Sequence, residues 1–365
     1  MKTNNHINNS EVRAEQVASK DYQTICLGAD LHKASISVTA ICDGHPKPTQ
    51  RLSWERFWPF VRRLQLQATG VYVVYEAGAF GFWPWRKLRE QGVECWVTHP
   101  RKLDVHHKRV QTDRLDSAQL ADDLQRYVGG NRRALKVVHV PSLAEEQARL
   151  EGRHRQHISK QLQRAKARGR GLLLSQGLFE TSQWWQPWVW AKVAERLGPE
   201  LRGVLADLRQ NILHYQEQLG RVERALKATA PKQLPKGFGQ LTFVLLLREL
   251  CNYGRFKERR GVGGFTGLCG GVSSSGPCHL DLSINKAGSP VIRTLLIELA
   301  WRMIYYQPQY TGLKIWKRLG GPLASVRRRK IALVATARQL AVDIWRWQTG
   351  QVTAQELGWQ MMPAN

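Results

Sequence analysis

The sequence predicts an α/β domain, then a long helical region, then a mainly helical domain. Three observations predict this order. Apolar runs alternate with helix-periodic segments over residues 22–140, an apolar heptad repeat covers residues 201–226, and amphipathic helical segments recur within residues 231–350. A chain of 365 residues exceeds what one hydrophobic core usually holds, so we expect two or three domains.

The α/β pattern begins with an apolar run that ends in Asp30. A segment that alternates with β-branched side chains follows it, as the second strand of a hairpin would. Two further apolar runs are each preceded by a segment with helical spacing, which predicts a partly parallel sheet. The predicted strands are residues 24–30, 35–41, 71–75 and 93–97, and the predicted helices are residues 54–66 and 83–91.

The middle of the chain has the pattern of a coiled coil. Between Leu201 and Leu226, apolar side chains recur at steps of four and three residues, which is the a/d spacing of a coiled coil. Residues 143–174 predict a second helix, and residues 178–198, which contain Pro187, predict the turn between the two. The heptad repeat favours self-association, as dimers that pair into a tetramer.

The last part of the chain predicts helices at both ends and a flexible middle. Residues 295–306 and 331–347 are amphipathic helical segments, and residues 261–288 are rich in Gly and Ser. The expected organisation is a disordered tail over residues 1–21, an α/β domain over 22–140, a coiled-coil region over 141–230, a C-terminal domain over 231–350 and a tail over 351–365.

The charge balance points to a polyanionic partner. Lys and Arg number 55 against 29 Asp and Glu, which gives a formal net charge of +26 and argues against an ordinary metabolic enzyme. The hydrophobic fraction of 42% is sufficient for packed cores, and no apolar run is long enough to cross a membrane. The sequence shows no secretory signal and its cysteines are scattered, so we expect a cytoplasmic protein with reduced thiols and no membrane partner.

Basic side chains concentrate in several segments. Between Arg153 and Arg170 there are seven Lys or Arg and no acidic residue, which indicates a solvated helix face or, as we favour, a stripe that binds a polyanion. A Gly-rich turn at residues 235–239 would offer backbone N–H groups to a phosphate, although a plain helix start looks the same. The candidate nucleic-acid contacts are Arg153, Arg155, Lys160, Arg164, Lys166, Arg168, Lys236, Lys286, Arg293, Arg327, Arg328, Arg329 and Lys330.

The chain has fourteen tryptophans, an unusually high number. Several cluster within residues 184–190, and Trp83 and Trp85 lie elsewhere. Packing in cores and interfaces is the expected role of these rings, in preference to stacking on nucleobases.

Four carboxylates stand at positions suited to a metal site. Asp30 and Glu76 each stand at the end of a predicted strand, and Asp113 and Asp116 share one face of a predicted helix. Taken singly, Asp113 would cap the helix and Asp116 would be a surface charge. Taken together, they supply the oxygen ligands that hard cations take, and two such ions clamp the attacking and leaving oxygens of a phosphodiester. The set therefore predicts bound Mg²⁺.

A run of serines between glycines is the second candidate site. Residues 270–276 hold three serines, and a free hydroxyl is a nucleophile only when charge nearby stabilises the reaction. Lys286 and Arg293 are candidate sources of that charge. The spacing alone favours a flexible loop.

In this order, these segments resemble the DEDD-type transposases of bacterial insertion sequences, a family described as bridge-RNA-guided recombinases. The resembling segments are LGADLHKASISV (27–38), VYEAGAFGFWPWRKLREQG (74–92), VTHPRKLDVHHKRVQTDRLDSAQLADDL (97–124), FTGLCGGVSSSGPCHLDLSINKAGSPVIRTLLIELAW (265–301) and RRRKIALVATARQLAVDIWRWQTG (327–350). The sequence departs from the family at Gln111, where a basic residue is usual, in Gly267-Leu-Cys-Gly270, where Gly-Leu-Thr-Pro is common, and near Asp281, where glycine is usual.

The resemblance implies a RuvC-like (ribonuclease H-type) domain, a coiled coil and a C-terminal transposase domain. It implies that Asp30, Glu76, Asp113 and Asp116 bind Mg²⁺ and that the nucleophile is Ser275 or Ser274, with Ser275 preferred because Gly276 follows it. The implied activity is RNA-guided DNA recombination through a phosphoserine linkage, with donor DNA, target DNA and a structured noncoding RNA as partners. His32, His106 and His107 are expected to be polar neighbours of the carboxylates rather than ligands.

Two other functions agree with the same residues. A RuvC-like nuclease would cut branched DNA with metal-activated water and would form no covalent adduct with DNA. A non-catalytic RNA-binding protein would need none of the four carboxylates.

Overall fold

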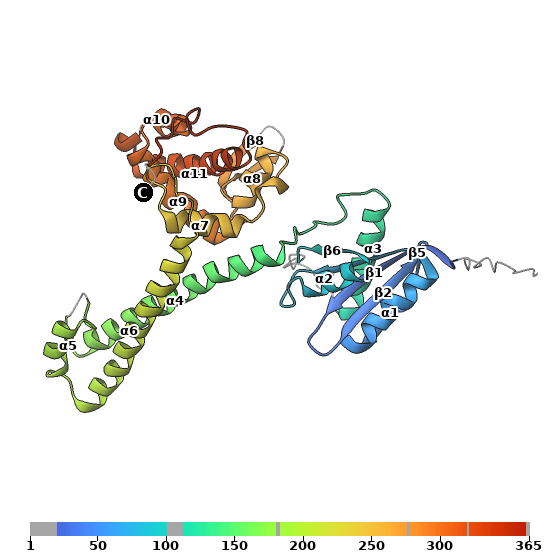
Figure 1. The fold of residues 1–365 in the computed structure, drawn as a ribbon, viewed down its shortest axis with the longest axis horizontal. Helices are drawn as coiled ribbons and strands as arrows, with labels where there is room; N and C mark the ends of the chain where they lie inside the picture. The colour runs from blue at the N-terminus through green and yellow to red at the C-terminus, as the bar shows by residue number, and fades with distance from the viewer. Residues whose placement is uncertain (1–19, 101–111, 180–182, 276–277, 320, 363–365) are drawn as a thin grey trace, which may run out of the picture. The chain divides into compact units, whose positions relative to one another are not determined.

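The computed structural model describes residues 20–100, 112–179, 183–275, 278–319 and 321–362. It divides into two compact units, residues 1–140 and 141–365 (Figure 1). The expected tail over residues 1–21 lies almost wholly outside the described residues. No helix among the described residues is both long and apolar enough to span a membrane.

The first unit is built on a mixed sheet, as the alternation of strands and helices predicts. Strand β1 (Tyr22–Leu31) pairs antiparallel with β2 (Ile36–Cys42) and parallel with β5 (Ala68–Glu76), which pairs parallel with β6 (Glu94–Thr98). The short strands β3 (His45–Pro46) and β4 (Gln50–Leu52), which the sequence analysis missed, extend the sheet beyond β2.

Helices cover both faces of this sheet. Helices α1 (Trp54–Gln67) and α2 (Trp83–Glu90) pack on the face of Leu27 and Val73. Helix α3 (Asp113–Val128) packs on the opposite face, against Cys26 and Val74. Since side chains alternate between faces along a strand, this fixes the face on which every residue of β1 and β5 lies.

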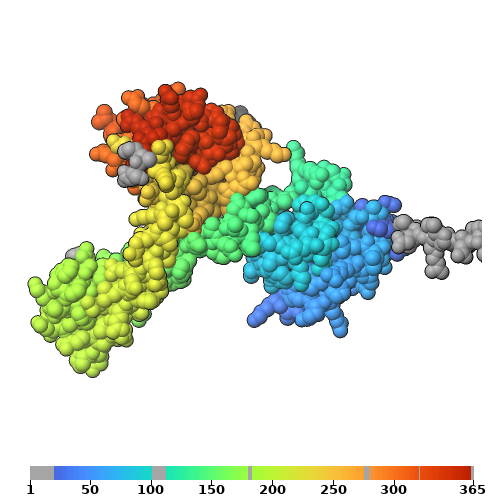
Figure 2. Space-filling view, viewed as in Figure 1, coloured from blue at the N-terminus to red at the C-terminus, as the bar shows by residue number. Residues whose placement is uncertain are grey.

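The second unit joins a long helical hairpin to a helical bundle. Helix α4 (Leu143–Ser175) packs along α6 (Pro199–Ala228), with α5 (Pro187–Ala194) at the far end; we call these three helices the arm (Figures 1 and 2). The bundle contains α7 (Gln240–Leu250), η1 (Tyr253–Arg255), α8 (Arg259–Thr266), α9 (Pro290–Tyr306), η2 (Thr311–Leu313), α10 (Lys314–Arg318), η3 (Gly321–Leu323) and α11 (Val326–Gln348). Residues 178–198, expected to form a turn, contain α5, which begins at Pro187.

The heptad seam of α6 packs inside the chain. Leu205 and Ile212 are buried in a cluster with residues of α4, and Leu226 is buried in the core of the bundle. The apolar heptad positions of α6 therefore pack on α4 of the same chain, and they give no support to self-association.

Two other expectations for this unit are wrong. The Gly- and Ser-rich segment is no loop but a two-stranded hairpin of β7 (Gly270–Ser275) and β8 (Cys278–Ile284). The segment after residue 350 is no tail, because Leu357 and Trp359 are buried in the core of the bundle. The ring centre of Trp359 lies 5.3 Å from that of Phe238 and 5.5 Å from that of Trp347.

Candidate active site

The ends of β1 and β5 bring Asp30 and Glu76 to one edge of the sheet. The two strands run parallel with Ala29 paired to Tyr75, so Asp30 and Glu76 stand next to each other in the register. Each lies an even number of residues beyond a side chain, Cys26 or Val74, that packs against α3. Both carboxylates therefore lie on the face that α3 covers.

Helix α3 carries the other two predicted carboxylates, of which Asp113 joins the cluster around Asp30. It begins at Asp113, and the Oγ1 of Thr112 caps it by accepting from the N–H of Leu115. Asp113 and Asp116 lie in its first turn. The helix lies close to β1 because Gly28 has no side chain: a Cβ there would be 2.1 Å from the carbonyl oxygen of Ser117 and 2.4 Å from the backbone nitrogen of Ala121.

Asp30, His32 and Asp113 form a tight cluster. The Nε2 of His32 lies 3.0 Å from Asp30 Oδ2 and 3.3 Å from Asp113 Oδ2, and one potential ligand atom from each residue lies within 4.8 Å of the others. Asp30 is 26% exposed and Asp113 is 45% exposed, so the cluster is open to a substrate. His32, expected from the sequence to be a polar neighbour rather than a ligand, is one of the three potential ligands.

The carboxylates also act on one another electrostatically. Burial raises the pKa of Asp30, the nearby His32 opposes that rise, and the charges of Asp113 and Asp116 add to it. Three carboxylates therefore share one electrostatic environment. Oxygen donors that repel one another at an open edge suit a hard divalent cation, which removes the repulsion when it binds. His106, His107 and Gln111 lie outside the described residues.

The serines stand on an exposed hairpin whose base is locked by close backbone contacts. Ser274 is exposed and pairs across the hairpin with His279, while Ser275 is the last residue of β7. At the base, the N–H of Lys286 donates to the carbonyl of Gly267 and the N–H of Asn285 donates to that of Cys269. A Cβ on Gly288 would lie 2.0 Å from a backbone oxygen of α8, so glycine is required there.

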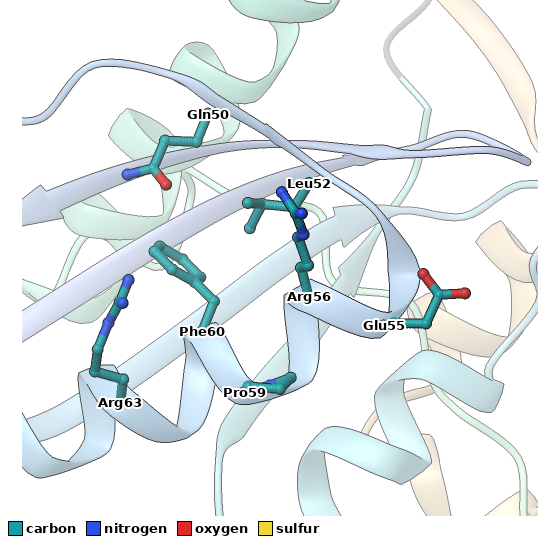
Figure 3. Close-up of a pocket in the computed structure, with 7 residues that line it drawn as sticks. All are labelled: Gln50, Leu52, Glu55, Arg56, Pro59, Phe60 and Arg63. Atoms are coloured by element: carbon teal, nitrogen blue, oxygen red, sulfur yellow. The ribbon is translucent and has the colours of Figure 1, made fainter.

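A separate hollow of about 500 Å³ lies on the first unit between β4 and α1, and none of the four carboxylates lines it. Arg56 and Arg63 line it from α1 with Phe60 between them (Figure 3).

Comparison with known proteins identifies the class of protein. Residues 234–312, which contain the hairpin, match the model of the transposase IS116/IS110/IS902 family. A putative transposase (y4rJ) of Sinorhizobium fredii is 30% identical over 333 residues, which cover 79% of this chain and 80% of that protein. The chain belongs to the IS116/IS110/IS902 family of transposases. A transposase of Coxiella burnetii, for insertion sequence element IS1111A, is 25% identical over 90% of both chains.

The transposase is thus an enzyme of insertion-sequence transposition, as the resemblance implies. Membership of the family agrees with the motif order noted in the sequence.

Two of the basic residues expected to bind nucleic acid are engaged inside the transposase. Arg153 donates from Nε to the buried Glu249 at 3.0 Å. Arg155 donates from Nε to Glu223 of α6 at 2.9 Å. Their partners lie 96 and 68 residues away in the chain, so the stripe that lacks acids in sequence is partly neutralised in three dimensions.

Other predicted contacts also serve the fold. Lys166 lies 4.3 Å from the ring centre of Trp185, and burial lowers its pKa. Arg293 donates to the carbonyl oxygens of Lys286 and Gly288 and so braces the segment after β8. In the turn at residues 235–239, the N–H groups of Lys236 and Phe238 bond to carbonyls of the same unit, so they are not offered to a phosphate.

The remaining basic side chains are accessible. Lys160, Arg164 and Arg168 recur every four residues on the exposed side of α4, and the described part of the chain gives them no acidic partner. The side chains of Lys236 and Lys286 are exposed. The first turn of α11 carries Arg327, Arg328, Arg329 and Lys330, with Arg329 half-buried and the others exposed.

Replacing Gly28 by alanine is expected to impair the transposase mainly through the position of α3. The added Cβ would meet backbone atoms of Ser117 and Ala121, so α3 and with it Asp113 must move away from Asp30. A displacement of about 1 Å at a reacting centre costs about a hundredfold in rate, and overpacking costs about 1–3 kcal/mol of stability. A strand-cleavage assay with a thermal melt measures both. Gly203→Ala, where no atom lies near the added Cβ, should leave cleavage unchanged and raise the melting temperature, since alanine favours a helix by about 1 kcal/mol over glycine. Equal activity of Gly28→Ala and wild type would contradict the argument.

Proposed function

We propose that the transposase cuts and rejoins DNA through a divalent-metal site formed by Asp30, Glu76, Asp113 and Asp116 and a serine nucleophile of the β7–β8 hairpin. The observation that carries the proposal is the convergence of Asp30 and Asp113 within 4.8 Å at the open edge of the sheet. The register of β1 and β5 supports the inclusion of Glu76, which stands beside Asp30, and the position of Asp116 in the first turn of α3 supports its inclusion.

The donor set suits Mg²⁺, the ion expected from the sequence. Carboxylate oxygens are its preferred ligands. The imidazole of His32 lies next to both Asp30 and Asp113, where it can orient their carboxylates. When bound, Mg²⁺ supplies positive charge that stabilises a phosphate under attack. The carboxylates hold that charge in place, and their partial exposure leaves room for a phosphodiester.

The serine step forms one covalent bond to DNA and breaks another. The Oγ of Ser275, or of Ser274, loses its proton to solvent and bonds to phosphorus, and the bond from phosphorus to the 3′ oxygen breaks. The 3′ oxygen takes up a proton, and the 5′ phosphate remains on the serine. The linkage conserves the energy of the phosphodiester for strand exchange, which hydrolysis by a nuclease would lose.

Nucleic acid is held by the remaining exposed basic side chains. Four basic residues at the start of α11 lie near the positive end of the helix dipole, which repels them. A phosphate bound there would offset this repulsion. We propose donor and target DNA as partners, together with a structured guide RNA that reads the DNA sequence by base pairing, so that the protein itself contacts backbones. Self-association into dimers and tetramers belongs to the same proposal and rests on the resemblance alone.

Two measurements test this function. DNA carrying the ends of the element should be cut in the presence of Mg²⁺ and left intact in EDTA. RNA that copurifies with the transposase should be one discrete species transcribed from beside the gene. Cutting in EDTA would refute the metal site, and copurification of random cellular RNA would refute the guide.

Replacing Lys160, Arg164 and Arg168 together by alanine is expected to weaken DNA binding and make it less sensitive to salt. The slope of log K against log salt is negative, and each lost phosphate contact reduces its magnitude by about 0.9. The triple variant should therefore have a slope smaller in magnitude by up to about 2.7. Fluorescence anisotropy over a salt series measures the slope. Arg155→Ala breaks the pair with Glu223, so it should lower the melting temperature of the protein and leave the slope unchanged. A triple variant with the wild-type slope would exclude this face of α4 from DNA binding.

A further inference from the structure

Four aromatic rings form an open cluster on the first unit, which we call the aromatic patch: Trp54, Trp58, Phe80 and Trp83. Trp54 lies 4.9 Å from Trp83 and 5.4 Å from Phe80, and Trp58 lies 5.8 Å from Trp83, as distances between ring centres. Trp83 is 44% exposed and the other three rings are half-buried. The patch therefore presents aromatic surface to solvent.

The aromatic patch lies at the same end of β1 and β5 as the carboxylates, on the side of the sheet that α1 and α2 cover rather than the side of α3. Phe80 stands four residues after Glu76, and Trp83 and Trp54 are the first residues of α2 and α1. The indole Nε1–H of Trp54 donates to the carbonyl of His32 at 3.0 Å, and the imidazole of His32 contacts Asp30 and Asp113. One residue therefore connects the patch to the proposed metal site.

Three of the other tryptophans are used for packing, while Trp188 on α5 is 62% exposed. Trp184 and Trp185 are buried in the arm, and Trp85 donates to the carbonyl of Cys95. The expectation of core packing thus holds for these three. Trp83, in contrast, has much of its surface free and reaches the cluster only through Trp54.

The charge beside the aromatic patch is suited to a phosphate backbone. The Nζ of Lys87 lies 4.2 Å from the ring centre of Trp58, and Lys33, next to His32 in the chain, is exposed. Proteins that bind single-stranded nucleic acid combine aromatic side chains with nearby cations. The rings stack on the π faces of the bases, and the cations contact the negatively charged phosphates. A base in a duplex is already stacked on both faces, so an unpaired base has most to gain.

We infer that the aromatic patch stacks an unpaired base of the DNA strand that enters the carboxylate site. Strand exchange requires local unpairing beside the cut, and stacking on Trp83 would hold the opened strand at the proposed metal site. The inference rests on the proposed function for the location of the cut, but base stacking itself can be measured without cleavage.

The test is photo-crosslinking in EDTA with a single-stranded oligothymidylate that contains 5-iododeoxyuridine. Mass spectrometry of the wild-type protein should find DNA attached to a peptide that contains Trp83. Trp83→Ala should reduce crosslinking to the aromatic patch about tenfold, in line with the loss of one stacked base, and Trp83→Phe should restore it to within about threefold of wild type. Trp188→Ala, which removes a 62% exposed ring on α5, is the matched control and should leave patch crosslinking unchanged.

Two results would overturn the inference: no crosslink within the aromatic patch, or equal crosslinking by Trp83→Ala and wild type. Asp30→Asn separates this test from the proposed function. It should retain the crosslink and lose cleavage. An active Asp30→Asn would refute the metal site and leave the stacking result intact.

Discussion

Replacing Asp30 by asparagine is expected to reduce DNA strand cleavage by roughly a thousandfold, because it removes a charged ligand from a site whose function is to hold a divalent ion. Asp30 interacts with every other member of the site. It lies next to Glu76 in the sheet and hydrogen-bonds to His32, and the charges of Asp113 and Asp116 raise its pKa. Cleavage of element-end DNA in Mg²⁺, followed on a denaturing gel, measures the effect.

Asp122→Asn is the matched control for that substitution. It changes the same functional group on α3, but Asp122 pairs with Arg126 one turn further along and is 52% exposed. It should cleave within about twofold of wild type, since an exposed i,i+4 pair contributes little. DNA binding by Asp30→Asn should be preserved. Wild-type cleavage by Asp30→Asn would mean that the cluster is not the metal site.

Replacing Ser275 by alanine is expected to abolish the covalent protein–DNA adduct completely, because alanine has no oxygen with which to bond to phosphorus. Ser275 is the preferred nucleophile because it ends β7 directly before Gly276, and Ser274 is the alternative. The adduct is detected as labelled DNA that migrates with the denatured protein.

The neighbouring serines provide internal controls on the same strand. Ser273→Ala should retain the adduct, and Ser274→Ala should retain it if Ser275 is the nucleophile. Loss of the adduct in Ser274→Ala alone would transfer the role to Ser274. Retention in both Ser274→Ala and Ser275→Ala would refute a serine mechanism and favour the nuclease that uses activated water.

Local patterns predicted most of the first unit. Asp30 and Glu76 could be placed at strand ends because apolar runs stop there, and the register of two parallel strands then brings the ends together. His32 was undervalued, since its contact with Asp113 crosses a gap of 81 residues that no local pattern describes. The close approach of α3 depends on Gly28, whose role is visible only when both elements are in place.

The second unit shows where local patterns mislead. The composition of residues 270–276 is typical of a loop, but the strand partner of Ser274 is His279, and cross-strand pairing overrides weak propensity. Pro187 suggested a turn and instead begins α5, because the first position of a helix needs no N–H donor. Arg153 and Arg155 looked unpaired because Glu249 and Glu223 reach them only after the chain folds back.

The most direct test of the central claim is binding of Mn²⁺, a paramagnetic substitute for Mg²⁺ that takes the same oxygen ligands, followed by electron paramagnetic resonance. Wild-type transposase titrated with Mn²⁺ should show saturable binding, and Asp30→Asn and Asp113→Asn should each weaken it at least about tenfold, while Asp122→Asn binds as wild type does. Equal Mn²⁺ affinity in wild type and Asp30→Asn would contradict the assignment of the metal site to the edge of this sheet.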